Sequence, residues 1–237
     1  MSTTARAGIV PRVKQIEYGD SALQIAASLT IHVEGEPQSG VDHLTKLLDR
    51  VLSVDIHHAS DSRSDADVCI EQAEQLPDGG DSDEAYALRV TEDQVTITAE
   101  TAAGIHYGAT TLIGLLEDQE KGWQIPACEI RDWPDYEWRG FMADPARGYI
   151  PLADLKRLVD RAARAKMNRF HLHLLDAESY ALKSEAYPEL GRNPDGESRE
   201  TYSQDDIHEL VDYAAARNIE VIPEIDVPSH ATHVLNH

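Results

Sequence analysis

Strand and helix patterns alternate through the second half of the chain, and this alternation constrains the fold more than any other feature. Three short apolar stretches have the length of buried strands: 141–144, 169–175 and 220–227. Two stretches between them predict helices: 151–166 and 203–217. The first places Leu155 and Val159 on one face, and the second begins with a capping pattern at Ser203. Strands joined through helices pair in parallel with right-handed crossovers, which predicts a β-α-β-α-β sheet.

Each of these three strands is followed by polar residues. They are Asp144 to Arg147, Asp176 to Glu178, and Asp226 to His230. In a parallel α/β barrel the carboxyl ends of the strands build the active site. Three successive strands with such ends therefore favour the start of a (β/α)8 barrel, whereas a single polar end would be weak evidence.

The first half of the chain follows a different order. A strand region is predicted at 22–33, a helix at 41–52, a short strand at 66–71, a hairpin at 85–90 and 94–99, and a helix at 103–117. Polar loops are expected at 61–67 and 77–84. This order predicts a small α+β domain over residues 1–130, followed by the start of a TIM barrel, strands one to three only, over residues 131–237.

The charge of the chain excludes some partners. With 43 Asp and Glu against 21 Lys and Arg, the net charge is −22, and such a field repels nucleic acid. No stretch approaches the roughly 20 apolar residues of a membrane helix. Residues 1–11 contain no long apolar run, so no signal peptide is predicted and a cytoplasmic location is favoured. Nothing in the sequence predicts the oligomeric state.

The composition of the charged residues suggests a habitat. The chain has only 6 Lys against 15 Arg, and its acids are spread along the whole length. An acidic, lysine-poor chain fits a salt-rich environment in which counterions screen self-repulsion, so we expect a halophilic protein. An ordinary acidic cytosolic protein is the alternative.

Neither cysteines nor histidines predict a metal site. Cys69 and Cys128 lack CxxC spacing and are expected to be free thiols. His171 and His173 share a strand face, but the spacing places no third ligand, so they are interpreted as barrel-filling side chains. We expect neither a metal nor a cofactor.

Three stretches resemble the start of the catalytic barrel of family-20 glycoside hydrolases, the β-N-acetylhexosaminidases. They are WRGFMADPAR at 138–147, KMNRFHLHLLD at 166–176 and VIPEIDVPSH at 221–230. Two further stretches resemble the small domain of this family and its junction with the barrel. They are YALRVTEDQVTITAETAAGIHYGATTLIGLL at 86–116 and IPACEIRDWPDYEWRG at 125–140. The resemblance covers about 86–237, with a looser match before it.

The resemblance implies a retaining, substrate-assisted glycosidase that removes terminal N-acetylhexosamine from an oligosaccharide or glycan. In this family an adjacent Asp-Glu pair follows barrel strand four, and it is expected after residue 237. Asp83 and Glu84 form the same dipeptide but follow no barrel strand, so they are not the catalytic pair. The chain is therefore expected to be incomplete and inactive alone. The alternative is a non-catalytic sugar-binding remnant or a pseudogene product.

The resemblance also assigns roles to individual residues. Arg147 matches the arginine that holds hydroxyls of the terminal sugar, and Asp176 and His230 match a pair that supports the acid Glu. Asp226 matches an Asp near the catalytic pair. Glu224, two residues earlier on the same strand side, is a candidate for substrate binding or for a structural role.

Two departures from the family pattern are visible. Ala177 and Glu178 stand where the family commonly has a polar or acidic residue followed by Gln, Gly or Ser, so the fine contacts of the subsite are expected to differ. Ser229 replaces the usual Gly before His230, and Ser does not tolerate all the backbone angles open to Gly.

Overall fold

The computed structural model describes residues 9–36, 38–52, 54–58, 63–76, 82–120, 122–192 and 197–236. They form two compact units, Met1–Glu137 and Trp138–His237. The predicted division between residues 130 and 131 lies inside strand β8 (Gly122–Asp132). None of the helices in the described ranges is long and apolar enough to span a bilayer.

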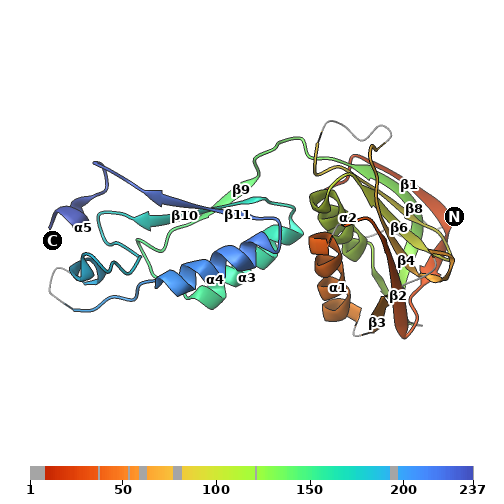
Figure 1. Ribbon diagram of the computed structural model, residues 1–237, viewed down its shortest axis with the longest axis horizontal. Coiled ribbons are helices and arrows are strands. Elements are labelled where there is room, and N and C mark those ends of the chain that lie inside the picture. The colour runs from red at the N-terminus through yellow and green to blue at the C-terminus, as the bar shows by residue number, and fades with distance from the viewer. Residues whose placement is uncertain are drawn as a thin grey trace. The chain divides into compact units, whose positions relative to one another are not determined.

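The first unit is a mixed sheet with helices on one face (Figure 1). Its strands run in the order β1-β8-β5-β6-β4-β2-β3, and β7 also pairs with β8. The remaining strands are β1 (Gln15–Gln24), β2 (Ser28–Glu34), β3 (Asp55–His58), β4 (Val68–Gln72), β5 (Tyr86–Val90), β6 (Val95–Ala99) and β7 (Glu117–Gln119). The helices are α1 (Gln38–Leu52) and α2 (Ala102–Gly114), with a 3-10 turn at Arg63–Asp65.

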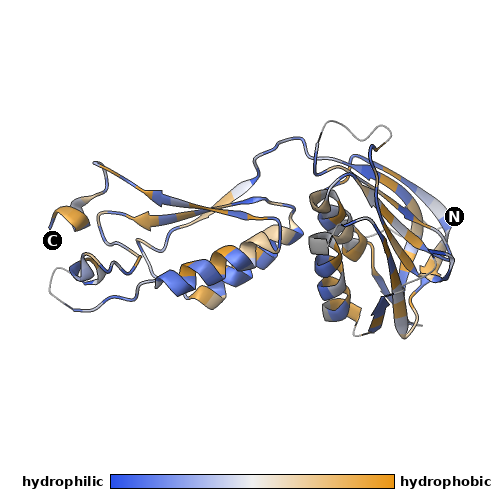
Figure 2. Cartoon of the chain, viewed as in Figure 1, coloured by the Kyte–Doolittle hydropathy of each residue, from blue (hydrophilic) through white to orange (hydrophobic). Residues whose placement is uncertain are grey.

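Alternating side chains explain the core of this unit. Leu88 on β5 faces Ile97 on β6 and Ile130 on β8, and all three are buried. The apolar sides of α1 and α2 close this core through residues such as Leu44 and Leu112. Orange and blue segments alternate along the strands in Figure 2, as expected for a sheet with one covered face. Cys69 and Cys128 are both buried and form no disulfide, in agreement with the expected thiols.

The structure corrects two predictions for the first unit. The expected single strand region at 22–33 is two strands, β1 and β2, separated at 25–27, and the sequence predicted none of β3, β7 and β8 as strands. Both expected loops lie partly outside the described residues. The undescribed parts are residues 77–81 of the loop at 77–84 and residues 61 and 62 of the loop at 61–67. The predicted hairpin is present as β5 and β6.

The second unit contains the predicted parallel sheet. Its strands β9 (Gly140–Ala143), β10 (Arg169–Leu175) and β11 (Glu220–Ile225) pair in parallel in the order β11-β10-β9. Helices α3 (Leu152–Arg164) and α4 (Gln204–Ala215) follow the first two strands, and Figure 1 shows both on one side of the sheet. The segment between β10 and α4 includes a 3-10 turn, Pro188–Gly191, and β11 is followed by a short helix, α5 (Thr232–Leu235).

Alternation along β10 separates the two faces of this sheet. Phe170, Leu172 and Leu174 are buried and pack in one cluster with Leu155 and Val159 of α3. The residues between them, among them His171 and His173, lie on the opposite face. The described structure therefore confirms a mixed α/β chain whose second half has parallel βα connectivity, and it places the polar strand residues away from the helices.

Candidate active site

Three side chains from three different strand ends meet in the second unit. Arg147 follows β9, Asp176 follows β10 and His230 follows β11. The guanidinium Nη2 of Arg147 is paired with Oδ2 of Asp176, and Nδ1 of His230 lies 3.0 Å from Oδ1 of Asp176. Because the strands are parallel, their carboxyl ends lie at one edge of the sheet, and residues up to 83 positions apart in the sequence converge there.

Arg147 is oriented by two carboxylates. Its Nη1 donates to Oδ2 of Asp144 at 2.5 Å, its backbone N–H donates to Oδ1 of the same residue at 3.1 Å, and its Nη2 pairs with Asp176. The Arg147 side chain nevertheless remains 49% exposed. A guanidinium group has five N–H donors in a fixed plane, so a fork held in this way can still offer donors to a ligand.

Asp176 is a buried carboxylate among hydrogen-bond donors. Its side chain is only 3% exposed. Burial raises the pKa of Asp176. The N–H of Ala177, the rings of His173 and His230, and the charge of Arg147 outweigh burial and hold the pKa well below its usual range. Asp176 is therefore ionised at neutral pH. It accepts a hydrogen bond from the N–H of Ala177, forms an ion pair with Arg147 and lies within hydrogen-bond distance of both rings.

His173 connects two of the strand ends. Its Nε2 lies 3.0 Å from Oδ2 of Asp176, and its Nδ1 lies 2.9 Å from Oε2 of Glu224, which is the residue paired with it on β11. The same Oε2 lies 2.5 Å from Nε2 of His171. The prediction that these histidines only fill the barrel is thus incomplete, because both contact a carboxylate.

Glu224 lies on β11, and Asp226 directly follows the end of this strand. The hydrogen bond with His173 lowers the pKa of Glu224 despite partial burial. His173, Glu224 and Asp226 bring ligand-type atoms within 4.8 Å of one another. Both ring nitrogens of His173 already face carboxylates, so the contacts among these residues describe a hydrogen-bonded network.

The turn that carries His230 accommodates Ser229. The left-handed backbone angle lies at His230 (φ 56°), and Ser229 is not among the residues with positive φ. The missing glycine therefore causes no strain at residue 229. A positive φ is uncommon for a non-glycine residue, and histidine is one of the side chains that tolerate it best.

The loop after β10 is anchored beneath its exposed residues. Ala177 and Glu178 are exposed, while the buried hydroxyl of Ser179 donates to the carbonyl oxygen of Ala146 at 2.6 Å. Nη1 of Arg199 donates to the carbonyl oxygen of Glu178 at 2.8 Å. The departures from the family pattern at 177 and 178 thus lie on the surface. The hydrogen bonds of Ser179 and Arg199 hold the backbone of this loop in place.

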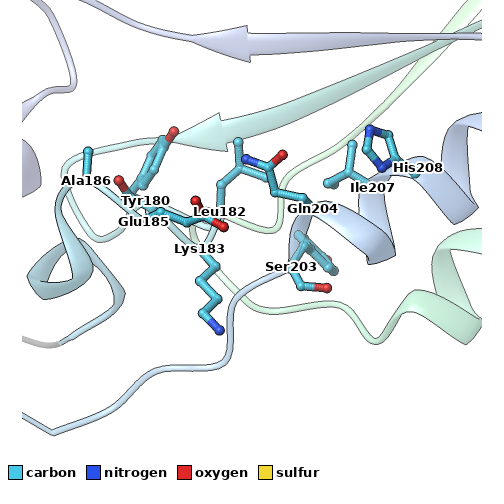
Figure 3. A pocket seen from close by; sticks show the side chains of 11 residues that line it. Tyr180, Leu182, Lys183, Glu185, Ala186, Ser203, Gln204, Ile207 and His208 are labelled. Atoms are coloured by element: carbon cyan, nitrogen blue, oxygen red, sulfur yellow. The ribbon is translucent and has the colours of Figure 1, made fainter.

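A separate cavity of about 500 Å³ lies between the segment after β10 and α4. Figure 3 shows Lys183 and Glu185 contributed by that segment, and Gln204, Ile207 and His208 contributed by the first turns of α4. The predicted site residues, all of which are described, do not line it. This cavity is therefore distinct from the convergence of Arg147, Asp176 and His230.

The sequence places Asp144 only among the polar residues after a strand, predicts a barrel-filling role for His173 and assigns no role to Ser179. The i, i+3 spacing of Asp144 and Arg147 was the available signal for the first. For His173 the signal was its position opposite Glu224, on the same face of the sheet, once β10 and β11 are aligned. Ser179 gave no comparable signal, because its partner is a backbone carbonyl.

Two family models match consecutive parts of the chain. Residues 6–133 match domain 2 of glycosyl hydrolase family 20, and residues 136–237 match the catalytic domain of the same family. A curated β-hexosaminidase from Akkermansia muciniphila is 44% identical over 159 residues, which are 62% of this chain and 32% of that protein. A β-N-acetylhexosaminidase from Cellulomonas fimi is 33% identical over 95% of this chain and 47% of its own length.

Solved structures agree with this result. The N-acetyl-β-hexosaminidase of Streptomyces plicatus, in complex with Thio-NAglucal, superposes with a TM-score of 0.85 at 30% identity over 98% of this chain and 48% of that chain. A family-20 exo-β-N-acetylglucosaminidase of Vibrio harveyi in complex with N-acetylglucosamine gives 0.86 at 26% identity, over 100% and 38%. The chain thus spans less than half the length of these relatives.

Proposed function

The chain belongs to glycosyl hydrolase family 20, and from this membership we propose that it supplies the sugar-holding part of a β-N-acetylhexosaminidase site. The activity is proposed for a protein of the relatives' length that includes these 237 residues. Its substrate is a terminal N-acetylhexosamine of an oligosaccharide or glycan. The convergence of Arg147, Asp176 and His230 from three strand ends is the observation that carries the proposal.

In this proposal Arg147 holds the hydroxyls of the terminal sugar. Asp144 and Asp176 fix the plane of its guanidinium group, so little side-chain freedom remains to be lost when the sugar binds. The half-exposed edge of the same group can donate to neighbouring hydroxyls, whose spacing matches a planar fork.

Asp176 and His230 form the supporting pair. A carboxylate that accepts from Nδ1 of an imidazole fixes the ring orientation and leaves Nε2 to face another group. In the proposed enzyme that group is the acid Glu, which protonates the leaving oxygen. Asp226 and Glu224 stand beside this pair, and Glu224 contributes to substrate binding through its position on β11.

The chemical step uses the substrate's own acetamido group. Its oxygen attacks the anomeric carbon while the acid Glu protonates the leaving oxygen, and a neighbouring Asp orients the acetamide. We propose that this Asp-Glu pair follows the fourth barrel strand of the whole protein. Residues 1–237 alone should then give no turnover of an aryl N-acetylglucosaminide.

The test is a steady-state assay of the whole protein with Arg147→Ala. Loss of charge-assisted hydrogen bonds should lower kcat/KM for an aryl N-acetylglucosaminide by about a hundredfold or more. Arg157→Ala is the matched control, because Arg157 is 72% exposed on α3 and pairs with Asp154. Equal kcat/KM for Arg147→Ala and Arg157→Ala, or turnover by residues 1–237 alone, would contradict the proposal.

A further inference from the structure

The buried ring of His173 faces a carboxylate on each side. Its side chain is 7% exposed, with Glu224 at 2.9 Å from Nδ1 and Asp176 at 3.0 Å from Nε2. An ionised carboxylate only accepts hydrogen bonds, and a neutral imidazole carries a single N–H. A neutral His173 could therefore donate to one of these partners and would oppose the other with a bare ring nitrogen.

The charged groups around His173 are predominantly acidic. Besides its two direct partners, Asp144, directly after β9, acts on it electrostatically, and Asp226 has a carboxylate oxygen within 4.8 Å of His173 and Glu224. On the other side, Arg147 pairs with Asp176. His230 shares Asp176 with His173, and His171 shares Glu224 with it. Even with one fixed guanidinium, four carboxylates surround a single buried ring.

We propose that His173 is a buried imidazolium that positions Asp176 and Glu224 by donating to both. In this state it joins β10 to the end of β11 through two charge-assisted hydrogen bonds. It also fixes Oδ2 of Asp176, so that Oδ1 of the same carboxylate faces His230. His173 thus acts on the sugar site through Asp176 and touches no substrate, and its use there rests on the proposed function.

The direction of its pKa agrees with this assignment. Burial lowers the pKa of His173, but the hydrogen bonds to Glu224 and Asp176 and the nearby charges outweigh burial and raise it above its usual value. The hydrogen bond from His173 is likewise the leading cause of the lowered pKa of Glu224. Both partners therefore favour the charged form of the other.

Ring ¹⁵N NMR of the histidine-labelled 237-residue chain tests the charge. Both ring nitrogens of His173 should be protonated at pH 7, and they should lose a proton at higher pH than a histidine reference peptide in the same sample. His173→Gln should remove these signals, whereas His208→Gln, at an exposed position of α4, should leave them unchanged. A single N–H on His173 at pH 7 would overturn the proposal.

A second variant keeps the test decisive if His173→Gln does not fold. Glu224→Gln removes one of the two negative charges in contact with His173, so it should shift the loss of the His173 proton to lower pH. Glu209→Gln, which only breaks an exposed pair with Lys156, should cause no shift. An unshifted His173 signal in Glu224→Gln would overturn the proposal.

Positioning is tested by the response of His230. When His173 loses its proton, the ring signals of His230 should shift at the same pH, because both rings donate to Asp176. Asp176→Asn should abolish this coupled shift. Signals of His230 that do not respond would overturn the positioning role. These measurements need no sugar, so failure to bind N-acetylglucosamine would count against the proposed function alone.

Discussion

The acidic and basic groups of the site give the second unit opposite pH dependences. The lowered pKa of Asp176 contributes stability above about pH 4, its unfolded value, and this contribution is lost as the pH falls through the folded pKa. The raised pKa of His173 contributes stability below about pH 6.5, and this is lost as the pH rises through its folded pKa. Together they favour the interval between these two values.

We therefore expect His173→Gln to change the shape of the pH–stability curve. The wild-type melting temperature should fall as the pH rises above about 6.5, and this fall should be smaller in the variant. Thermal unfolding followed by near-UV circular dichroism between pH 5 and 9 measures both curves. His208→Gln is the control, and parallel curves for wild type and His173→Gln would refute the expectation.

A glycine in α2 makes a second prediction for a single residue. A Cβ at Gly104 would overlap the carbonyl oxygen of Ala85 and lie 2.6 Å from Cβ of Ala99. Gly104→Ala should therefore destabilise the first unit by about 1–3 kcal/mol, because backbone has to move. At Gly114, in the same helix, the nearest atom is 3.9 Å away, so Gly114→Ala should be neutral or stabilise by up to about 1 kcal/mol. Urea unfolding of both variants compares them, and equal effects would contradict the steric argument.

Individual site residues differ in how far the sequence can predict them. The placement of Arg147, Asp176 and His230 at strand ends follows from the order of the strands, because parallel strands bring their carboxyl ends together. The contact between His173 and Glu224 depends on the register between β10 and β11. A shift of one residue would place the Glu224 side chain on the opposite face of the sheet. Because the sequence alone does not supply that register, it predicts only a barrel-filling side chain for His173.

At the scale of elements, α4 begins with a complete capping box. The hydroxyl of Ser203 accepts from the backbone N–H of Asp206 at 3.1 Å, and the Asp206 carboxylate accepts from the backbone N–H of Ser203 at 2.8 Å. The hydrogen bonds from Ser203 lower the pKa of Asp206. The sequence predicted this start because Ser and an acid three residues later satisfy N–H groups that a helix leaves open.

Removing the cap should destabilise the helix. Ser203→Ala should cost about 1 kcal/mol, whereas Ser203→Asn should remain close to wild type, because Asn is also a preferred N-cap residue. The free energy of unfolding in urea measures both. If Ser203→Asn lost as much stability as Ser203→Ala, the capping interpretation of Ser203 would be wrong.

Strands β1 and β8 show why some elements are missed. β1 is exposed at most of its positions, so it lacks the alternation that identifies a strand. β8 contains Pro126, which usually argues against a strand within a sheet. In the structure Pro126 lies opposite Ala22, beside the register shift between Tyr18 and Ala22, where the ladder of β1 and β8 is irregular. Long-range pairing, rather than local preference, forms this part of the sheet.

At the scale of the whole molecule, acidic groups outnumber basic groups by 43 to 21. Ion pairs therefore occupy only part of the acidic surface, and the remaining carboxylates repel one another in the compact state. We propose that this charge balance is an adaptation to salt. The screening length falls from about 10 Å at 0.1 M to about 3 Å at 1 M, which removes repulsion between neighbouring surface charges.

The melting temperature of the 237-residue chain should consequently rise steeply between dilute buffer and molar KCl. Screening also weakens the exposed pairs, such as Arg157 with Asp154, but exposed pairs contribute little individually, so the relief of repulsion dominates. Sucrose at matched osmolality is the control, because it is excluded from the protein surface without screening charge. A melting temperature that responds equally to sucrose and KCl, or to neither, would remove the salt argument and leave an ordinary acidic protein, whose −22 charge would then serve solubility alone.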